Sequence, residues 1–468
     1  MVWLRQHGWT PGDRIGLGLS NQPDGAALLQ ATLLAGLTAV LFHRQLHPEV
    51  LRQQAAAMAL TAVVVAEGHP LAQIGCPVTL PLPTLNNLSA PLLLSPIVLN
   101  YSAPALILFT SGTSGESKAV QLSHRAVAAA AQAAVTRLGL NPADTWLACL
   151  PMDHIGGASI VLRAALCGYR LVFTERFSTD VVTNLIDHAG ITGLSVVPTM
   201  LHRLIEQRGT RPWPATLRCL LTGGGPLSRE LIARSTALGL APCETYGLSE
   251  ACSQVCTLAP AEAAAHPGSA GRPVDGMAVT IRSPDGDTLS AGISGQICIR
   301  GASLFDGYVL PAPKGHAAHC AIRENAAFDA MESHPAIWHP TGDLGWMDAD
   351  GFLHILGRLD DMIISGGENI APAEIEAALE RHPGIAAAGV YGLPDAEWGH
   401  IVAAALVARD QPVSADEIQA FLRTQLSRFQ RPRHLAWVPS LPTTATGKIQ
   451  RSRLREWVSR PKGPLSEI

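Results

Sequence analysis

Short apolar runs alternate with alanine-rich segments along this chain as far as Ser269. β-Branched and aliphatic residues dominate these runs, which is typical of strands that are buried on both faces. The segments between them are long enough to form crossover helices, so the pattern predicts an α/β fold with mainly parallel strands. The expected buried strands are Arg14–Leu19, Ala62–Val65, Ala105–Phe109, Trp146–Leu150, Arg170–Thr174, Gly193–Val197 and Leu217–Thr222.

The pattern changes after Ser269, where shorter strands and turns at 284–286 and 348–351 predict a small barrel-like β subdomain. A chain of 468 residues is too long for one hydrophobic core. We expect a large N-terminal domain, residues 1–359, and a small mobile α+β C-terminal domain, residues 360–468. The C-terminal elements expected are a helix at 371–381, strands at 386–391 and 401–408, and a helix at 414–427. Residues 311–335 are expected to form a mobile loop insertion.

Composition limits the partners of this chain. Charged residues make up 15% and the net charge is -4, which argues against a nucleic-acid partner. The longest apolar stretch, 26–42, is interrupted by polar residues and short for a membrane span, so we expect a buried helix that runs into a strand. The start of the chain lacks a signal-like apolar core, which favours the cytoplasm.

The nine cysteines include no C-x-x-C pair and are expected to be reduced, with Cys252 and Cys256 packed in the core. A homo-oligomer is left open.

A loop rich in glycine and hydroxyl groups follows Phe109 and leads toward a helix expected near His124. Glycines let the backbone N–H groups approach an anion, hydroxyls donate further hydrogen bonds, and a lysine adds positive charge. The loop therefore predicts a phosphate site, with a flexible surface loop as the alternative. It is not a Walker loop, because Ala119 stands where that motif has a hydroxyl. The residues expected at phosphate are Thr110, Ser111, Gly112, Thr113, Ser114, Gly115 and Lys118.

Further segments add groups that suit a nucleotide. Glycines after a strand leave a backbone shelf for a flat base. An aromatic ring, a hydroxyl and a carboxylate follow at Tyr246, Ser249 and Glu250, and the last two are ligand types that Mg²⁺ accepts. Asp343 lies at a turn and can accept hydrogen bonds from both ribose hydroxyls. Lys448 lies in a loop of small residues near the C-terminus. The remaining members of these segments are Gly223, Gly224, Gly225, Pro226 and Gly247.

The order of these segments resembles the adenylate-forming acyl- and aryl-CoA synthetases, and the resemblance covers nearly the whole chain. It implies that the loop at 110–118 holds ATP phosphates, that the glycine and Tyr246 segments hold adenine and Mg²⁺, and that Asp343 and Arg358 hold ribose. Lys448 would bridge the acid carboxylate and the α-phosphate. ATP, Mg²⁺ and CoA are the cofactors and cosubstrates implied.

The same resemblance assigns a hinge and a CoA channel near the predicted domain boundary. Asp360 matches the hinge residue, although the residue alone would equally suit a surface turn. The loop that would face the thioester step comprises Ser365, Gly366 and Gly367. By this resemblance the chain begins near what is normally the second helix, so we expect the family's usual opening strand and helix to be missing, through a late start or a trimmed N-terminus.

Segments 150–157, 197–201 and 250–258 resemble the o-succinylbenzoate–CoA ligases of menaquinone and phylloquinone synthesis. The resemblance implies an acid pocket lined by His154, Thr199, Ser253 and Gln254, with His154 as gate and polar contact. From the residues alone, a core or surface histidine is the favoured interpretation of His154, and small polar residues in a turn are usually structural. Three positions depart from the family pattern, namely Ser249 for threonine, Asp153 for an aromatic residue and Thr443 for a basic residue.

The sequence therefore predicts ATP-dependent ligation of CoA to 2-succinylbenzoate through an acyl-adenylate. The residues expected to act in catalysis are Lys448, His154 and Glu250. A CoA ligase for another aryl or medium-chain acid is the nearest alternative. An amino-acid adenylation domain fits less well, because Asp153-His154 lacks the Phe-Asp pair expected for an α-amino group. A non-catalytic nucleotide-binding protein is the alternative from another class.

Overall fold

The computed structural model describes residues 2–76, 78–84, 99–111, 117–309, 322–324, 338–365, 368–395, 398–443, 449–458 and 466–467. The loop expected at 311–335 therefore lies outside the described residues except for 322–324. The α-helices are α1 Val2–Gln6, α2 Pro23–Leu34, α3 Pro48–Ala56, α4 His124–Leu138, α5 Ile155–Cys167, α6 Thr179–His188, α7 Pro198–Arg208, α8 Arg229–Ala237, α9 Pro372–Leu379, α10 Ala415–Arg423 and α11 Arg451–Val458.

The first sheet has eight strands in the order β17-β16-β6-β5-β2-β1-β3-β4. Its strands are β1 Arg14–Gly18, β2 Thr38–Leu41, β3 Ala62–Val65, β4 Thr79–Pro81, β5 Pro104–Ser111, β6 Ser117–Ser123, β16 Gly307–Val309 and β17 Ile322–Glu324. Strands β1 to β5 pair in parallel, whereas β6, β16 and β17 add on in antiparallel fashion. The glycine-rich loop thus joins two antiparallel strands.

The second sheet has seven strands in the order β13-β12-β11-β10-β9-β7-β8. Its strands are β7 Thr145–Ala148, β8 Arg170–Phe173, β9 Gly193–Val196, β10 Cys219–Thr222, β11 Cys243–Leu248, β12 Ser253–Thr257 and β13 Arg272–Pro273. Pairing is parallel from β8 to β11 and antiparallel at β12 and β13. The glycines 223–225 directly follow the carboxyl end of β10, the usual place for ligands in such sheets.

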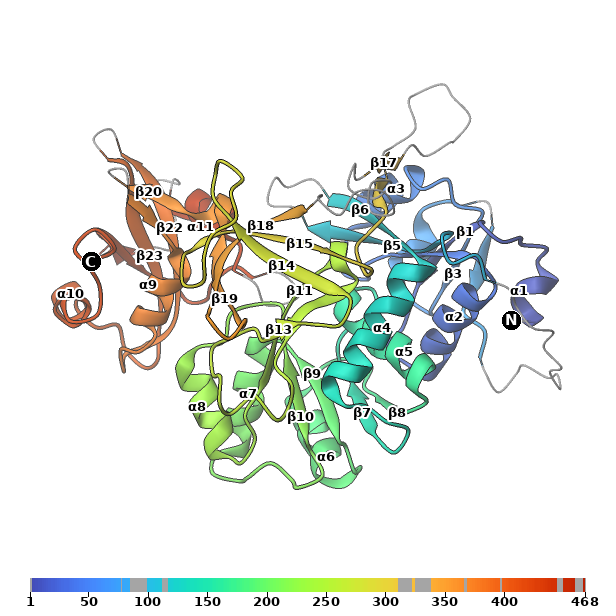
Figure 1. Cartoon of the computed structure of the whole chain (residues 1–468), viewed down its shortest axis with the longest axis horizontal. Coiled ribbons are helices and arrows are strands. Elements are labelled where there is room, and N and C mark those ends of the chain that lie inside the picture. The colour runs from blue at the N-terminus through green and yellow to red at the C-terminus, as the bar shows by residue number, and fades with distance from the viewer. Residues whose placement is uncertain are drawn as a thin grey trace.

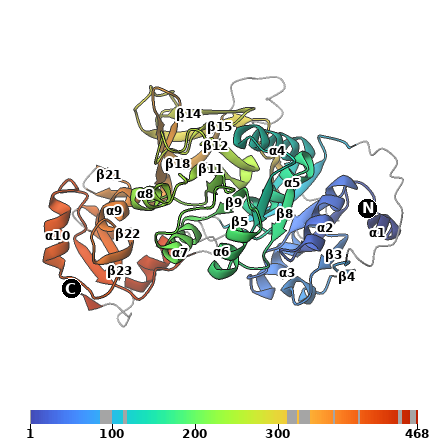
Figure 2. The ribbon, with the colours of Figure 1, turned by 90° about the horizontal axis from the view of Figure 1, so that it is seen from below.

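Helices α4 and α5 pack against each other between these two sheets (Figures 1 and 2). Their facing residues are alanines and aliphatic side chains, which allow close helix packing. The N-cap of α4 is Ser123, whose Oγ accepts a hydrogen bond from the Ala126 N–H at 3.3 Å. The helix pair therefore lies between the sheets, and the small pocket described below lies against it.

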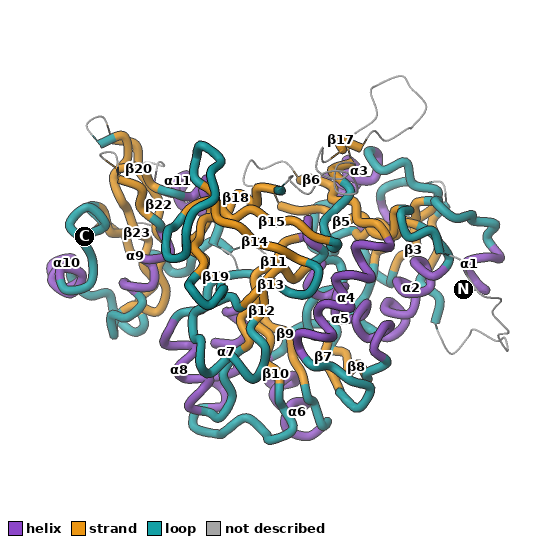
Figure 3. Tube along the Cα trace, in the orientation of Figure 1, coloured by secondary structure: helices purple, strands orange, loops and turns teal. Residues whose placement is uncertain are grey.

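A third, antiparallel sheet has four strands in the order β14-β15-β18-β19, and β14 lies next to β12 (Figure 3). Its strands are β14 Met277–Arg282, β15 Gly295–Gly301, β18 His339–Met347 and β19 Leu353–Arg358. The predicted change of pattern after Ser269 is confirmed, because this sheet is antiparallel throughout. The expected shortening of the strands is wrong, since β18 has 9 residues whereas β7 and β10 have 4 each. The predicted boundary at 359/360 falls in the 3₁₀ helix η4, Leu359–Asp361, and stays a prediction.

The C-terminal residues form a further sheet with its own hydrophobic core, seen as the orange and red lobe in Figure 1. Its strands are β20 Ile363–Ser365, β21 Glu368–Ile370, β22 Ile385–Asp395, β23 Gly399–Ala408, β24 His434–Trp437 and β25 Ser466–Glu467. An ion-pair network holds it together: Arg451 donates to both oxygens of Glu376 at 2.7 Å and to Asp361 at 3.2 Å. Among the described helices, none is long and apolar enough to cross a bilayer.

Candidate active site

Three of the residues expected at the nucleoside meet at one place. Asp343 on β18 is paired in register with Arg358 on β19, and its Oδ1 accepts from the Arg358 Nε at 2.9 Å. Its Oδ2 accepts a 2.6 Å hydrogen bond from the hydroxyl of Tyr246 on β11. Burial and the Asp343 charge raise the pKa of Tyr246, so this hydroxyl stays a donor. The carboxylate is thereby oriented by two donors from neighbouring strands.

A second group brings together the charges expected at the phosphates and the metal. The Lys118 Nζ lies 5.2 Å from the ring centroid of Tyr308 on β16. The Tyr308 hydroxyl donates to the Glu250 Oε1 at 2.9 Å, and Phe305 packs against its ring at 4.9 Å. Burial and the Glu250 charge raise the pKa of Tyr308. Tyr308 thus connects the cation expected at phosphate with the carboxylate expected at the metal.

Glu250 fits a magnesium ligand. It lies in a one-turn 3₁₀ helix, η3 Ser249–Ala251, directly after β11, and its backbone carbonyl accepts from the Phe305 N–H at 2.7 Å. Because Tyr308 occupies only Oε1, the other carboxylate oxygen remains for a hard cation. The hydroxyl of Ser249 belongs to the same turn.

The glycines of these segments permit close backbone approach. A Cβ on Gly247 would lie 1.7 Å from the Ser253 carbonyl oxygen, so a side chain is excluded there by the β11–β12 pairing. A Cβ on Gly223 would clash with the Thr245 side chain. Gly224 has φ +82°, a conformation that L residues rarely adopt. Gly225 and Pro226 continue this exposed segment.

Several predicted site residues lie outside the described part of the chain. These are Gly112, Thr113, Ser114, Gly115, Gly366, Gly367 and Lys448. Thr110 and Ser111 form the last residues of β5, which places the glycine-rich loop at the end of that strand. Ser365 is buried at the end of β20, and Asp360 lies inside η4. Their functional roles stay predictions.

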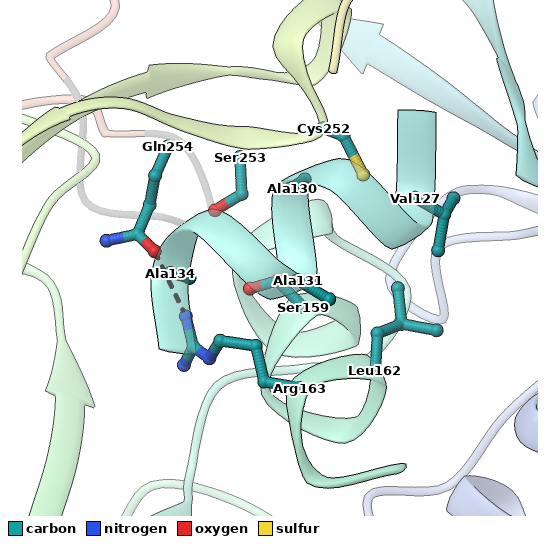
Figure 4. Close-up of a pocket in the computed structure, with 10 residues that line it drawn as sticks. All are labelled: Val127, Ala130, Ala131, Ala134, Ser159, Leu162, Arg163, Cys252, Ser253 and Gln254. Atoms are coloured by element: carbon teal, nitrogen blue, oxygen red, sulfur yellow. Dashed lines mark hydrogen bonds between the residues drawn. The ribbon is translucent and has the colours of Figure 1, made fainter. Parts of the chain in front are cut away.

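A pocket lies between α4, α5 and the start of β12 (Figure 4). It is lined by Val127, Ala130, Ala131, Ala134, Ser159, Leu162, Arg163, Cys252, Ser253 and Gln254. Its cavity volume of about 10 Å³ is roughly the space of one water molecule, so a ligand group could enter only if the surrounding side chains moved apart. Ser253 and Gln254 were expected to line the acid pocket, and both border this space.

Arg163 is the charged side chain of this pocket, and only 1% of its surface is exposed. Its Nη1 donates to the Gln254 Oε1 at 3.4 Å, and its guanidinium lies 5.2 Å from the Trp146 ring centroid. Its Nε and Nη2 are buried and make no hydrogen bond of normal length among the described residues, although the guanidinium lies close enough to the Tyr169 hydroxyl to oppose the rise that burial causes in the Tyr169 pKa. A buried charge with free donors is costly unless an anion completes it. The pocket therefore suits a carboxylate.

The backbone beside this pocket is strained. Cys252 has φ 52° and Ser253 has φ 99°, both unusual for residues other than glycine. The conformation directs the Gln254 side chain inward, where its Nε2 donates to the Thr257 Oγ1 at 2.9 Å and leaves its Oε1 for Arg163. Such strain often accompanies binding sites, because the surrounding structure must hold it in place.

His154 and Thr199 do not line the described pocket. His154 is the N-cap residue of α5 and contacts His43, with ring centroids 4.6 Å apart. Burial and His43 lower the pKa of His154, although Asp153 opposes the shift, so the ring is neutral at pH 7. Thr199 is exposed in the first turn of α7. Their proposed contacts with the acid stay untested.

Sequence reasoning missed both Tyr308 and Arg163. Tyr308 lies on a three-residue strand with no motif around it. Arg163 lies in the apolar helix α5, and a charged residue on such a helix was the available signal, since arginine is rarely fully buried without a partner.

Replacing Tyr308 by phenylalanine is expected to lower kcat/KM for ATP by about tenfold, because the hydroxyl that orients Glu250 is lost while the ring packing remains. Steady-state kinetics with varied ATP and Mg²⁺ measure this. Tyr391→Phe is the matched control, since the buried Tyr391 hydroxyl has no described partner. An unchanged ATP dependence in Tyr308→Phe would exclude this role for the hydroxyl.

The comparisons with known proteins agree with this geometry. The model of the AMP-binding enzyme family matches residues 2–309, and that of the AMP-binding enzyme C-terminal domain matches residues 374–448. The chain therefore belongs to the family of AMP-binding enzymes.

Two relatives illustrate the likeness. The chain is 37% identical over 352 residues to the 2-succinylbenzoate–CoA ligase of Bacillus cereus (strain Q1), covering 75% of this chain and 70% of the relative. The o-succinylbenzoate CoA synthetase (MenE) from Bacillus subtilis, in complex with the acyl-adenylate intermediate OSB-AMP, superposes with a TM-score of 0.84 at 31% identity, covering 99% and 91% of the two chains. Its complex with ATP and a magnesium ion gives a TM-score of 0.82, covering 97% and 91%.

Proposed function

We propose that this protein ligates CoA to 2-succinylbenzoate in an ATP-dependent, AMP-forming reaction of menaquinone or phylloquinone synthesis. The names of the relatives support the reaction and the acid. ATP, Mg²⁺ and CoA are the corresponding cofactors and cosubstrates, and a relative binds ATP with magnesium. The free thiols of the described cysteines support a reducing compartment such as the cytoplasm.

The chemistry requires activation of a carboxylate, which has a poor leaving group. The carboxylate attacks the α-phosphate of ATP, pyrophosphate leaves, and the thiol of CoA then displaces AMP from the acyl-adenylate. Charge grows on the phosphates in the first step, so fixed cations should provide much of the acceleration. Asp343 would hold the ribose, Lys118 would face the phosphates, and Glu250 would hold Mg²⁺, which neutralises phosphate charge when bound.

The observation that carries the choice of acid is the buried guanidinium of Arg163 with two free donor groups. 2-Succinylbenzoate has one carboxylate to activate and a second, on the ring, that stays ionised. A pocket for such an acid needs a cation that pairs with the second carboxylate in a desolvated place. Ser253 and Gln254 border the same pocket and supply further polar groups. A site of this kind rejects acids that leave its polar groups unpaired.

Comparison of acids under identical ATP and CoA tests the proposal. We expect 2-succinylbenzoate to have the highest kcat/KM among 2-succinylbenzoate, benzoate, 4-coumarate and octanoate, by about 10²-fold or more. A preference for one of the other three would retain a CoA ligase and overturn the choice of acid. No AMP formation with any acid would overturn the activity itself.

We also propose that Asp360 is the hinge between two orientations of the C-terminal residues. Its place in the one-turn helix η4, between β19 and β20, supports this. Rotation at this point would replace the segment that contains Lys448 by the segment that contains Ser365 next to the acid carbonyl. Such an exchange is needed because the two half-reactions require different residues around that carbonyl. The measurement that tests the hinge is described with Lys448 below.

A further inference from the structure

Three side chains that can bind a metal converge near the N-terminus of α5. His43 follows β2, whereas Asp153 and His154 immediately precede α5. One ligand atom from each lies within 4.8 Å of the other two. The two imidazole rings are 4.6 Å apart and inclined at 65°. Residues about a hundred positions apart in the chain are therefore held at the spacing of a metal site.

Two atoms of this cluster are buried and have no hydrogen-bond partner within the part of the chain that the structure describes. They are the Asp153 Oδ1 and the His154 Nε2. The other carboxylate oxygen of Asp153 accepts from the Arg44 backbone N–H at 3.0 Å, which orients the carboxylate. Buried polar atoms without partners are rare in folded proteins and indicate a missing ligand or water. Here a buried imidazole nitrogen and a buried carboxylate oxygen belong to one cluster of metal-binding side chains.

We propose that His43, Asp153 and His154 bind one zinc ion and leave a fourth position open. Two imidazoles and one carboxylate match the ligand types of three-ligand zinc sites. Mg²⁺ prefers a set made of oxygen atoms, so it competes poorly here. The three ligands are other residues than Glu250, where Mg²⁺ is expected, and the inference does not depend on the proposed reaction.

The present geometry predicts a zinc site of moderate affinity. The Nδ1 of His43 accepts a 3.0 Å hydrogen bond from the Gln45 backbone N–H. Binding zinc through Nε2 moves the ring proton to Nδ1, so that this hydrogen bond is given up. The site should bind more weakly than a closed structural site with four protein ligands, and one ligand position stays open to water.

Zinc at this position would tie two parts of the N-terminal fold together. One part is the segment between β2 and α3, and the other is the N-terminus of α5. Because Arg163 lies on α5, the ion would also hold the helix that carries the pocket arginine. A ligand that binds only the folded state raises the melting temperature.

The test uses the full chain, freed of metal by a chelator and then dialysed. Titration with ZnCl₂ in calorimetry is expected to give one saturable site that excess Mg²⁺ does not displace. Replacement of zinc by Co²⁺ is expected to give the visible absorption bands of a four-coordinate site. His43→Gln and Asp153→Asn should each weaken zinc binding tenfold or more, and zinc should raise Tm in the parent but not in these variants.

His202→Gln is the control, because His202 is exposed on α7 and is not a member of the three-residue cluster. It should bind zinc like the parent. The proposal is overturned if the parent binds no zinc, if Co²⁺ gives no four-coordinate spectrum, or if both cluster variants bind zinc as the parent does. The Co²⁺ spectrum of the parent tests the proposal even if a variant fails to fold.

Discussion

Replacing Arg163 by leucine is expected to lower kcat/KM for 2-succinylbenzoate by about 10²-fold or more. The substitution removes the pocket cation, so the ring carboxylate would enter a buried space without a charged partner. Stability should change little or rise, because an apolar side chain replaces a buried charge whose Nε and Nη2 have no described partner. Loss of activity would therefore not be a loss of fold, and the melting temperature checks this.

The sharper measurement uses a matched acid, 4-oxo-4-phenylbutanoate, which has the same skeleton without the ring carboxylate. The parent should reject it strongly, whereas Arg163→Leu should treat the two acids nearly alike. Arg163→Lys keeps the charge but not the planar donors, so its preference for 2-succinylbenzoate should be intermediate between those of the parent and of Arg163→Leu. If the leucine variant keeps the parent's preference for 2-succinylbenzoate, Arg163 is a packing residue only.

Arg208 offers a matched control for a buried arginine. It is also about fully buried and lies 4.6 Å from the Trp213 ring centroid, but its Nη1 is paired with Asp187 at 2.9 Å. Because the Arg208→Leu variant leaves Asp187 with one cationic partner fewer, it should lose stability. It should leave the preference between the two acids unchanged, since Arg208 does not line the pocket.

The strands buried on both faces were predictable, because short apolar runs between crossover helices have few other solutions. Ala62–Val65 was predicted to the residue, and the other expected buried strands were found within about two residues of their ends. The apolar stretch 26–42 is α2 running into β2, as expected.

The antiparallel additions were missed for a physical reason. Ser117–Ser123 pairs with β5, and Leu106 lies opposite Leu122, yet serines at both ends of the segment resemble loop and cap residues. Ser123 is indeed both the last residue of β6 and the N-cap of α4. On its other side β6 pairs with β16, which is far away in sequence, and local sequence does not encode that partner.

Some residues of the candidate site were likewise predictable from the sequence, whereas others were missed. Tyr246, Asp343 and Glu250 were singled out because glycines and turns around them indicate ligand contact. Arg163 and Tyr308 act, in our proposal, through their position in the tertiary structure. A charge inside an apolar helix could have been noticed, but what it faces depends on the β11–β12 segment, which is far away in sequence.

Replacing Lys448 by alanine is expected to lower the rate of adenylation by about 10²-fold or more, because a positioned cation at a developing anion contributes strongly to the rate. Lys448 lies outside the described residues, so this expectation rests on its motif and on the family match, which extends to residue 448. The rate of the thioester step should be unchanged, because in that step the phosphate charge departs with AMP and no new charge grows on it. Exchange of pyrophosphate into ATP measures the first half-reaction, and turnover of synthetic acyl-adenylate with CoA measures the second.

Two further variants make the Lys448 result specific. Lys462→Ala removes a lysine outside the matched segment and should leave both half-reactions unchanged. Asp360→Pro should give the opposite pattern to Lys448→Ala, because a ring that fixes φ at the proposed hinge hinders rotation but not the first step. Equal loss of both half-reactions in Lys448→Ala would contradict a role confined to adenylation. Unchanged thioester formation in Asp360→Pro would make Asp360 an ordinary turn residue and leave the rotation to other positions of the segment between β19 and β20.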